Sequence, residues 1–213
     1  MMDRLNIKIC GMKYPENVKQ VAELGPDYIG FIFYNKSARY VGEHPDPEMF
    51  ESVPERIKKV AVFVNESVER MIDITNRWQI NVVQLHGNES IATCERLKTE
   101  GKVIIKAIPG EKTSVIAKAK IYAPYVDYFL FDTPTETYGG SGKKFDWRVL
   151  HGMEFSVPLF LSGGLGPGDA EEIGKADLNN FHAIDLNSGF ESSPGKKDTV
   201  MLKHFLKQLK DGK

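Results

Sequence analysis

Four side chains that can exchange protons stand at or near the ends of short apolar runs. Cys10 and Asp132 each end such a run, His86 directly follows one, and Asp185 lies within another. A thiol, an imidazole and a carboxyl group can each act as a general acid or base. A thiol base needs a pKa below its usual value of about 8.5, and a carboxyl donor needs one above about 3.9. We therefore predict acid–base chemistry, with Cys10 reachable by solvent and partly ionised and with Lys8 not flanking it.

Each candidate also has a structural interpretation. A lone cysteine is more often a small buried apolar group than a base. Asp132 could accept hydrogen bonds from loop amides, and His86 could be a structural histidine at a strand end. Arg39 could be a solvated surface charge, or its planar fork could bind a carboxylate. Cys94 lies on a predicted helix among apolar residues, which favours a structural role.

Small residues follow the last two apolar runs. Gly163 and Gly164 follow the seventh run, and Ser188 and Gly189 follow the eighth. Glycine lets backbone N–H groups come close to an anion, and a helix N-terminus adds a favourable dipole. These residues predict a phosphate site. The stretch GGSGKK from position 139 is not a nucleotide P-loop, because positions 137 and 144 lack the required glycine and hydroxyl residue.

Short apolar runs alternate along the chain with stretches of helical period. Pro15 suits the first turn of a helix and Gly25 its end, while Asn65 or Ser67 and then Asp198 can cap two further amphipathic helices. Weaker helices are expected over residues 47–53, 89–99, 113–120, 146–152 and 167–175. The eight expected strands cover residues 6–10, 28–33, 59–64, 82–85, 103–107, 128–132, 158–161 and 183–186.

This alternation predicts an α/β fold with a parallel sheet, because each strand must return through a crossover helix. A doubly wound dinucleotide-binding sheet would carry Gly-x-Gly-x-x-Gly after its first strand, where this chain has CGMK. Eight units in 213 residues suit a single (β/α)8 TIM barrel that spans residues 1–213 as one domain. In such a barrel the carboxyl ends of the strands form the mouth where chemistry takes place.

Composition points to a small-molecule partner. The net charge is −1, with 28 basic and 29 acidic residues interspersed, so we expect no nucleic-acid and no membrane partner. The N-terminus lacks the layout of a signal peptide, and no run approaches the ~20 apolar residues of a membrane span. We expect a cytoplasmic protein, either a monomer or a homodimer. Two cysteines are too few for a disulfide framework or a cysteine metal cluster.

Motifs along nearly the whole chain resemble those of one family, the phosphoribosylanthranilate isomerases. The likeness is specific because so many motifs occur in the same order. They are KICGM at 8–12, GFIF at 30–33, SARYV at 37–41, VFVN at 62–65, VQLHG at 83–87, FLFDT at 129–133, GGSGKKFDW at 139–147, PLFLSGGL at 158–165 and DLNSGFE at 185–191.

The resemblance implies roles for individual residues. Cys10 is similar to the family's general base and Asp132 to its general acid, while Arg39 resembles the arginine beside the anthranilate carboxylate. His86 and Asp185 are further candidates for substrate contact. The chain departs from the usual Ser-Pro-Arg of the second loop, where it has Ala38, and from a common threonine in the sixth loop, where it has a serine at position 141.

The implied reaction is an Amadori rearrangement of a phosphorylated aminoaldose into an aminoketose. An acid protonates the ring oxygen, the nitrogen lone pair expels it, and a base takes the proton from the second carbon. We expect no redox cofactor and no metal, because no electrons leave the substrate. Two alternatives remain: indole-glycerol-phosphate synthase, whose lysine acid the strand ends do not obviously offer, and a non-catalytic phosphometabolite-binding protein.

Overall fold

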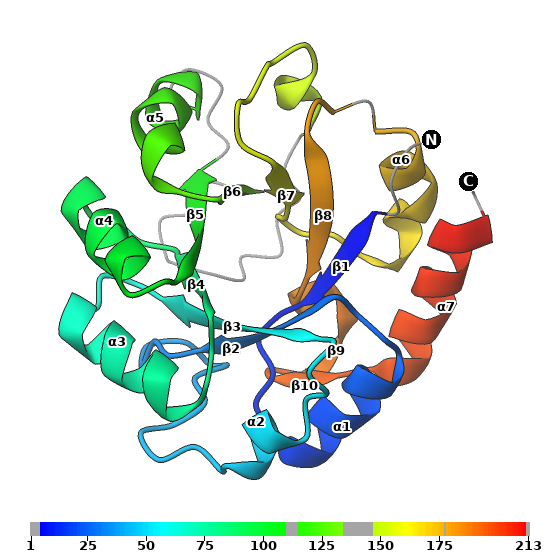
Figure 1. The fold of residues 1–213 in the computed structure, drawn as a ribbon. Helices are drawn as coiled ribbons and strands as arrows, with labels where there is room; N and C mark the ends of the chain where they lie inside the picture. The colour runs from blue at the N-terminus through cyan, green and yellow to red at the C-terminus, as the bar shows by residue number, and fades with distance from the viewer. Residues whose placement is uncertain (1–4, 110–114, 134–146, 177, 212–213) are drawn as a thin grey trace.

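The strands form a closed barrel. The computed structural model describes residues 5–109, 115–133, 147–176 and 178–211. Parallel strands follow each other around the barrel in chain order, and the last pairs with the first (Figure 1). This confirms the predicted (β/α)8 architecture and all eight expected strands. They are β1 Asn6–Ile9, β2 Tyr28–Ile32, β3 Lys58–Phe63, β4 Val82–Leu85, β5 Val103–Pro109, β6 Tyr128–Asp132, β7 Leu159–Leu161 and β8 Phe181–Leu186.

Each strand is covered on both faces, which explains why the runs are apolar without alternation. A small cluster fills the barrel interior and includes Val60, Ile105, Leu130 and Phe160. A larger cluster lies between the strands and the surrounding helices. Burial of these two layers is the main favourable contribution to folding.

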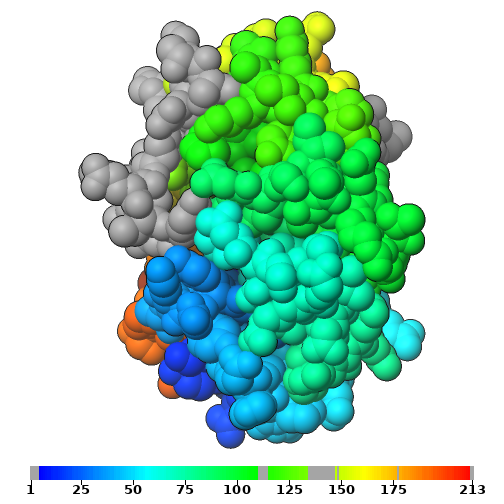
Figure 2. Space-filling model, turned by 90° about the vertical axis from the view of Figure 1, so that its left-hand side faces the viewer, coloured from blue at the N-terminus to red at the C-terminus, as the bar shows by residue number. Residues whose placement is uncertain are grey.

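Helices surround the barrel on the outside (Figure 1). Pro15 begins the first helix, and Ser67 and Asp198 accept hydrogen bonds from backbone N–H groups at two others, as predicted. Figure 2 shows the side on which α3, α4 and α5 cover the strands. The helices are α1 Pro15–Glu23, α2 Glu48–Glu51, α3 Val68–Arg77, α4 Ile91–Thr99, α5 Val115–Tyr122, α6 Ala170–Gly174 and α7 Thr199–Asp211, with 3-10 turns η1 Ala123–Tyr125, η2 Trp147–Leu150, η3 Pro167–Asp169 and η4 Ser188–Phe190.

The structure differs from the sequence expectations in three places. The helix expected over 146–152 is the short turn η2, with position 146 outside the described residues, and the one expected over 167–175 divides into η3 and α6. A hairpin of β9 (Glu191–Ser193) and β10 (Lys196–Lys197) follows β8 and was not predicted. Within the described ranges, no helix has the length and apolar character needed to cross a membrane.

The hairpin of β9 and β10 is hydrogen-bonded to α1, the first helix of the chain. Asn17 of α1 donates to the backbone oxygen of Lys197 at 3.0 Å and accepts from its N–H at 2.7 Å. Asn17 is buried, so this contact satisfies polar groups away from water. The contact fixes the hairpin beside the carboxyl end of β1.

Candidate active site

The predicted proton-exchanging residues gather at one end of the barrel. Cys10 directly follows β1 and His86 directly follows β4, while Asp132 ends β6 and Asp185 lies near the end of β8. Parallel strands in a closed barrel bring these ends to the same mouth. His86 Nε2 lies 3.3 Å from Asp132 Oδ2, so two candidates from strands far apart in sequence are in contact.

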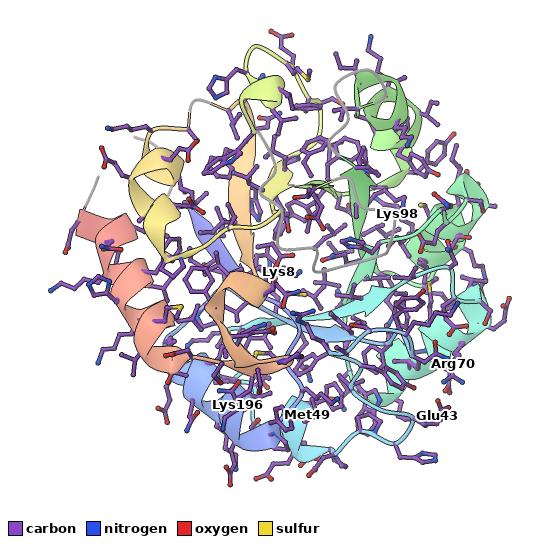
Figure 3. All side chains as sticks on the ribbon, turned by 180° about the vertical axis from the view of Figure 1, so that it is seen from behind. Lys8, Glu43, Met49, Arg70, Lys98 and Lys196 are labelled. Carbon is purple, nitrogen blue, oxygen red and sulfur yellow. The ribbon has the colours of Figure 1, made fainter. Side chains whose placement is uncertain are left out.

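Lys8 lies inside the barrel, near its centre in Figure 3. Its Nζ forms an ion pair with Asp185 Oδ2 at 2.7 Å and donates to Gln84 Oε1 at 2.7 Å. The expectation that Lys8 would not flank Cys10 is wrong, because residues i and i+2 of a strand point to the same face. Both side chains point into the barrel, and the Lys8 ammonium is close enough to the Cys10 thiol to act on its pKa.

The Cys10 thiol is enclosed. Its relative exposure is 3%, so the expectation of a solvent-reachable, partly ionised thiol is not met. Burial raises the pKa of Cys10 and the Asp185 charge adds to this, while the ammonium groups of Lys8 and Lys197 act in the opposite direction. The thiol therefore lacks the low pKa of a preformed thiolate, although the nearby Lys8 and Lys197 would stabilise a thiolate charge.

Asp185 has one paired and one unpaired oxygen. Oδ2 accepts from Lys8, whereas Oδ1 is buried and accepts no hydrogen bond from any residue the structure describes. Burial raises the pKa of this carboxyl, and the nearby charge of Asp132 adds to the rise, while Lys8 and His86 lower it. A buried acceptor without a donor is unfavourable, so a donor on a bound molecule would stabilise it.

Asp132 and His86 face the open part of the mouth. Their side chains are 24% and 19% exposed, more than those of Lys8 and Asp185 beneath them. Asp132 Oδ1 accepts from the N–H of Thr133 at 2.8 Å, so Asp132 does accept a hydrogen bond from a loop amide, through this one oxygen. Oδ2 faces His86, and the carboxyl group can still reach a molecule in the mouth.

Arg39 is held by a residue that sequence analysis missed. Its Nε and Nη2 bond to the Glu191 carboxylate in a bidentate pair, at 2.9 Å to Oε1 and 2.7 Å to Oε2. Lys197 Nζ also donates to Glu191 Oε1 at 2.6 Å and to Asn187 Oδ1 at 2.8 Å. Gly11 has φ +77°, and a Cβ there would lie 2.7 Å from Arg39 Cδ, so the arginine passes directly over this turn.

The Arg39, Glu191 and Lys197 group carries a net positive charge. Burial raises the pKa of Glu191, but hydrogen bonds and charge from Arg39 and Lys197 outweigh it and hold the pKa below its usual value. Two cations thus share one carboxylate at the rim, where an anionic group of a ligand would be favoured.

The predicted phosphate loops come together beside β7 and β8. Gly163 and Gly164 have φ values of +90° and +69°, in the left-handed region that glycine adopts readily. A Cβ at Gly189 would lie 2.2 Å from the backbone oxygen of Leu165, so only glycine allows the two loops to approach this closely. Ser188 begins the turn η4 in the same loop.

Comparison with known proteins identifies the family. Residues 7–208 match the family model described as N-(5'phosphoribosyl)anthranilate (PRA) isomerase. The N-(5'-phosphoribosyl)anthranilate isomerase of Parabacteroides distasonis is 45% identical over 204 residues, which cover 95% of this chain and 92% of that protein. The chain belongs to the phosphoribosylanthranilate isomerase family.

Solved structures of phosphoribosylanthranilate isomerases agree in fold. The crystal structure of the Thermotoga maritima protein has a TM-score of 0.83 and 37% identity, and the match covers 98% of this chain and all (100%) of that one. A phosphoribosylanthranilate isomerase in complex with reduced 1-(o-carboxyphenylamino)-1-deoxyribulose 5-phosphate has a TM-score of 0.80 and 34% identity, with 98% of this chain and 100% of that chain covered.

Membership of the phosphoribosylanthranilate isomerase family decides against indole-glycerol-phosphate synthase. The strand ends do offer a lysine, contrary to the expectation from the sequence, because Lys8 brings an amine into the barrel. This amine is tied to Asp185 and Gln84.

Three residues around the site were missed and a fourth, Lys8, was wrongly excluded from contact with Cys10; a signal existed for two of the four. Lys8 and Gln84 each stand two positions before a candidate at a strand end, so strand periodicity places them on the same inward face. Glu191 and Lys197 belong to the hairpin after β8, whose approach to Arg39 the chain order does not reveal.

Proposed function

We propose that this enzyme isomerises N-(5-phosphoribosyl)anthranilate to 1-(2-carboxyphenylamino)-1-deoxyribulose 5-phosphate for tryptophan biosynthesis, with Cys10 as general base and Asp132 as general acid. The observation that carries this proposal is their arrangement. Cys10 directly follows β1 and Asp132 ends β6, and β7 and β8 lie between these two strands around the barrel. An acid and a base on two sides of one substrate are what an Amadori rearrangement requires.

Asp132 acts first in this scheme. Its carboxyl proton passes to the furanose ring oxygen, the bond between this oxygen and the first carbon breaks, and the anthranilate nitrogen forms an iminium. Asp132 must therefore be protonated in the complex.

Cys10 acts second. The thiolate takes the proton from the second carbon, and the electron pair of that C–H bond neutralises the iminium to give an enolamine, which tautomerises to the ketone. One proton enters at the ring oxygen and one leaves from carbon, so the sum is an isomerisation. The positive iminium adds to Lys8 and Lys197 in stabilising the thiolate, which offsets the pKa increase caused by burial.

The remaining predicted residues bind the ends and the middle of the substrate in this proposal. The backbone around Gly163, Gly164, Ser188 and Gly189 binds the phosphate. Arg39 binds the anthranilate carboxylate while Glu191 fixes the plane of its guanidinium. In this proposal His86 and Asp185 contact the sugar, and the buried Oδ1 of Asp185, for which the structure describes no donor, supports this for Asp185. The proposed site residues are Cys10, Arg39, His86, Asp132, Gly163, Gly164, Asp185, Ser188 and Gly189.

The decisive experiment is a turnover assay. Freshly made phosphoribosylanthranilate loses its fluorescence when it is isomerised, so we expect a rapid decrease on addition of the purified protein. Indole-glycerol phosphate formation from the product should not follow. Absence of the fluorescence decrease would refute the proposal.

The wider organisation is proposed with it. We infer that residues 1–213 form one catalytic barrel, and that the enzyme works in the cytoplasm, where charged phosphorylated metabolites are retained. A structure of a related protein is described as that of monomers generated from the dimeric enzyme of Thermotoga maritima. Sedimentation equilibrium will show whether this chain is a monomer or a homodimer.

A further inference from the structure

Gln84 occupies the centre of a chain of polar side chains that crosses the barrel interior. It is the third residue of β4, its side chain points inward, and its relative exposure is 1%. Its Oε1 accepts from Lys8 Nζ at 2.7 Å, and its Nε2 lies 2.9 Å from His86 Nδ1. His86 Nε2 lies 3.3 Å from Asp132 Oδ2. This series of side-chain contacts therefore runs from Lys8 to Asp132 through Gln84 and His86.

The direction of each hydrogen bond in this chain follows from the first donor. A lysine ammonium has three N–H groups and no acceptor, so it must face the oxygen of the Gln84 amide and not its nitrogen. The NH₂ group of Gln84 is then turned toward His86 and can only donate. His86 Nδ1 must accept, which leaves the ring hydrogen of neutral His86 on Nε2. That hydrogen points at the carboxylate of Asp132.

The same geometry opposes the protonated form of His86. An imidazolium carries hydrogens on both ring nitrogens, so the N–H at Nδ1 would face the NH₂ group of Gln84, donor against donor. Gln84 cannot rotate its amide to relieve this conflict without turning its NH₂ group toward the Lys8 ammonium. Lys8 is itself fixed by its ion pair with Asp185.

From this we infer that Gln84 is a positioning residue, which keeps His86 neutral with its hydrogen on Nε2, so that His86 holds the Asp132 carboxyl without taking its proton. The charged groups that face this pair are Asp132 from β6, Asp185 from β8 and Lys8 from β1. A second proton on His86 would set two donors against each other at Gln84, so Asp132 remains the group of the pair that exchanges a proton with the substrate. This consequence rests on the role proposed above for Asp132.

Nitrogen-detected NMR of the histidine rings tests the inference without reference to activity. The chain has five histidines, and comparison with a His86→Gln spectrum identifies the signals of His86. In the unchanged protein at pH 7 we expect Nε2 to carry hydrogen and Nδ1 to be bare. A hydrogen on Nδ1 at this pH would overturn the inference.

The isosteric variant Gln84→Glu provides the second test. Its carboxylate can still accept from Lys8, but its other oxygen now requires a donor from His86. We expect Nδ1 of His86 to carry a hydrogen at pH 7, since it then donates to the new carboxylate oxygen in hydrogen-bond contact. Unchanged His86 signals would overturn the inference. The control is Gln208→Glu, the same charge change on the exposed face of α7, which should leave His86 and kcat unchanged.

Kinetics then separate the inference from the proposed mechanism. With Gln84→Glu we expect kcat to fall about tenfold or more, less than the roughly 10²-fold for loss of the proton donor itself, and KM to change little. Altered NMR signals with normal kcat would leave the tautomer assignment intact and refute Asp132 as the acid. Should Gln84→Glu fail to fold, Gln84→Met removes both hydrogen bonds without adding charge. It should give a mixture of His86 tautomers, and a pure Nε2–H form in that variant would also overturn the inference.

Discussion

The sulfur of Cys10 occupies the space beside Gly30 that a side chain at position 30 would need. A Cβ at Gly30 would lie 2.6 Å from Cys10 Sγ, closer than two such atoms can approach. The missing side chain on β2 therefore makes room for the thiol on the inner side of the barrel. The position of the proposed base depends on the residue next to it in the sheet, as well as on its own strand.

The first prediction concerns Cys10 itself. Cys10→Ala should keep the folded state and bind a product analogue, but lower kcat by roughly 10²-fold or more, because the base is removed. Cys94→Ala is the matched control: Cys94 is a buried thiol of α4, so its loss should reduce stability and leave kcat intact. Near-normal turnover by Cys10→Ala would make Cys10 structural.

Alkylation extends this prediction, since only the thiolate reacts. Burial raises the pKa of both thiols, that of Cys94 to about 11. Inactivation by iodoacetamide should therefore be slow at pH 7 and keep accelerating above pH 9, with Cys10 as the modified residue in peptide mass maps and protection by a product analogue. A rate that is already constant between pH 6 and pH 8 would contradict the raised pKa of Cys10.

Asp132→Asn tests the proposed acid with little change in shape. The amide can still accept from the Thr133 N–H, so folding and KM should change little. It cannot deliver a proton, and kcat should fall by roughly 10²-fold or more. Single-turnover kinetics will separate the chemical step from product release. A kcat within twofold of the parent enzyme would remove Asp132 from the mechanism.

Arg39→Lys tests recognition of the anthranilate carboxylate. Lysine keeps the charge but loses the planar fork that pairs with Glu191. KM for phosphoribosylanthranilate should rise about tenfold or more, in line with loss of a charge-assisted bidentate contact. The aniline analogue, which lacks the carboxylate, should show the same KM with both enzymes. An equal rise for both compounds would mean that Arg39 acts through the loop structure alone.

Gly189→Ala tests the contact between the two phosphate loops. Its Cβ would meet the Leu165 backbone oxygen at 2.2 Å, so one loop must move. We expect the free energy of unfolding to fall by about 1–3 kcal/mol and KM to rise. The control is Gly168→Ala in η3, where nothing lies within 4 Å of the added carbon. Equal urea midpoints and KM values for the two variants would contradict this account.

His182, at the start of β8, should make stability depend on pH. It lies 2.9 Å from Tyr28 Oη, and burial followed by the Lys58 charge lowers its pKa below the usual value, while Asp27 opposes this. The unfolded pKa of about 6.5 is then higher than the folded one. The stability that neutral His182 provides is complete above about pH 6.5 and is lost as the pH falls through the folded pKa.

Urea unfolding at pH 7 and pH 5 measures this effect. The parent protein should lose more unfolding free energy between the two values than His182→Phe, which keeps the aromatic packing but cannot take up a proton. The exposed His204→Gln variant of α7 is the control and should behave as the parent. An equal loss in the parent and in His182→Phe would show that His182 does not contribute.

The sequence predicted most of the fold because barrel strands are short, apolar on both faces and separated by capped helices. It also predicted that Cys10, Asp132 and Asp185 share a mouth, since strand ends meet there whatever the details of packing. The burial of Cys10 could not be predicted, because it depends on contacts across strands, such as the one with Gly30. Glu191 reaches Arg39 only through a hairpin that follows the last strand, and local patterns do not indicate where such a hairpin lies.

The pairing of β1 with β8 has a consequence for synthesis of the enzyme. Lys8 and Asp185 are 177 positions apart in sequence and yet in direct contact inside the barrel. On the ribosome, Lys8, Cys10 and Asp132 all emerge before the strand that must close the ring around them. Contacts of such long sequence separation form late and slowly. A nascent chain therefore cannot turn over substrate until its eighth strand has docked, so the onset of isomerisation during translation would report ring closure.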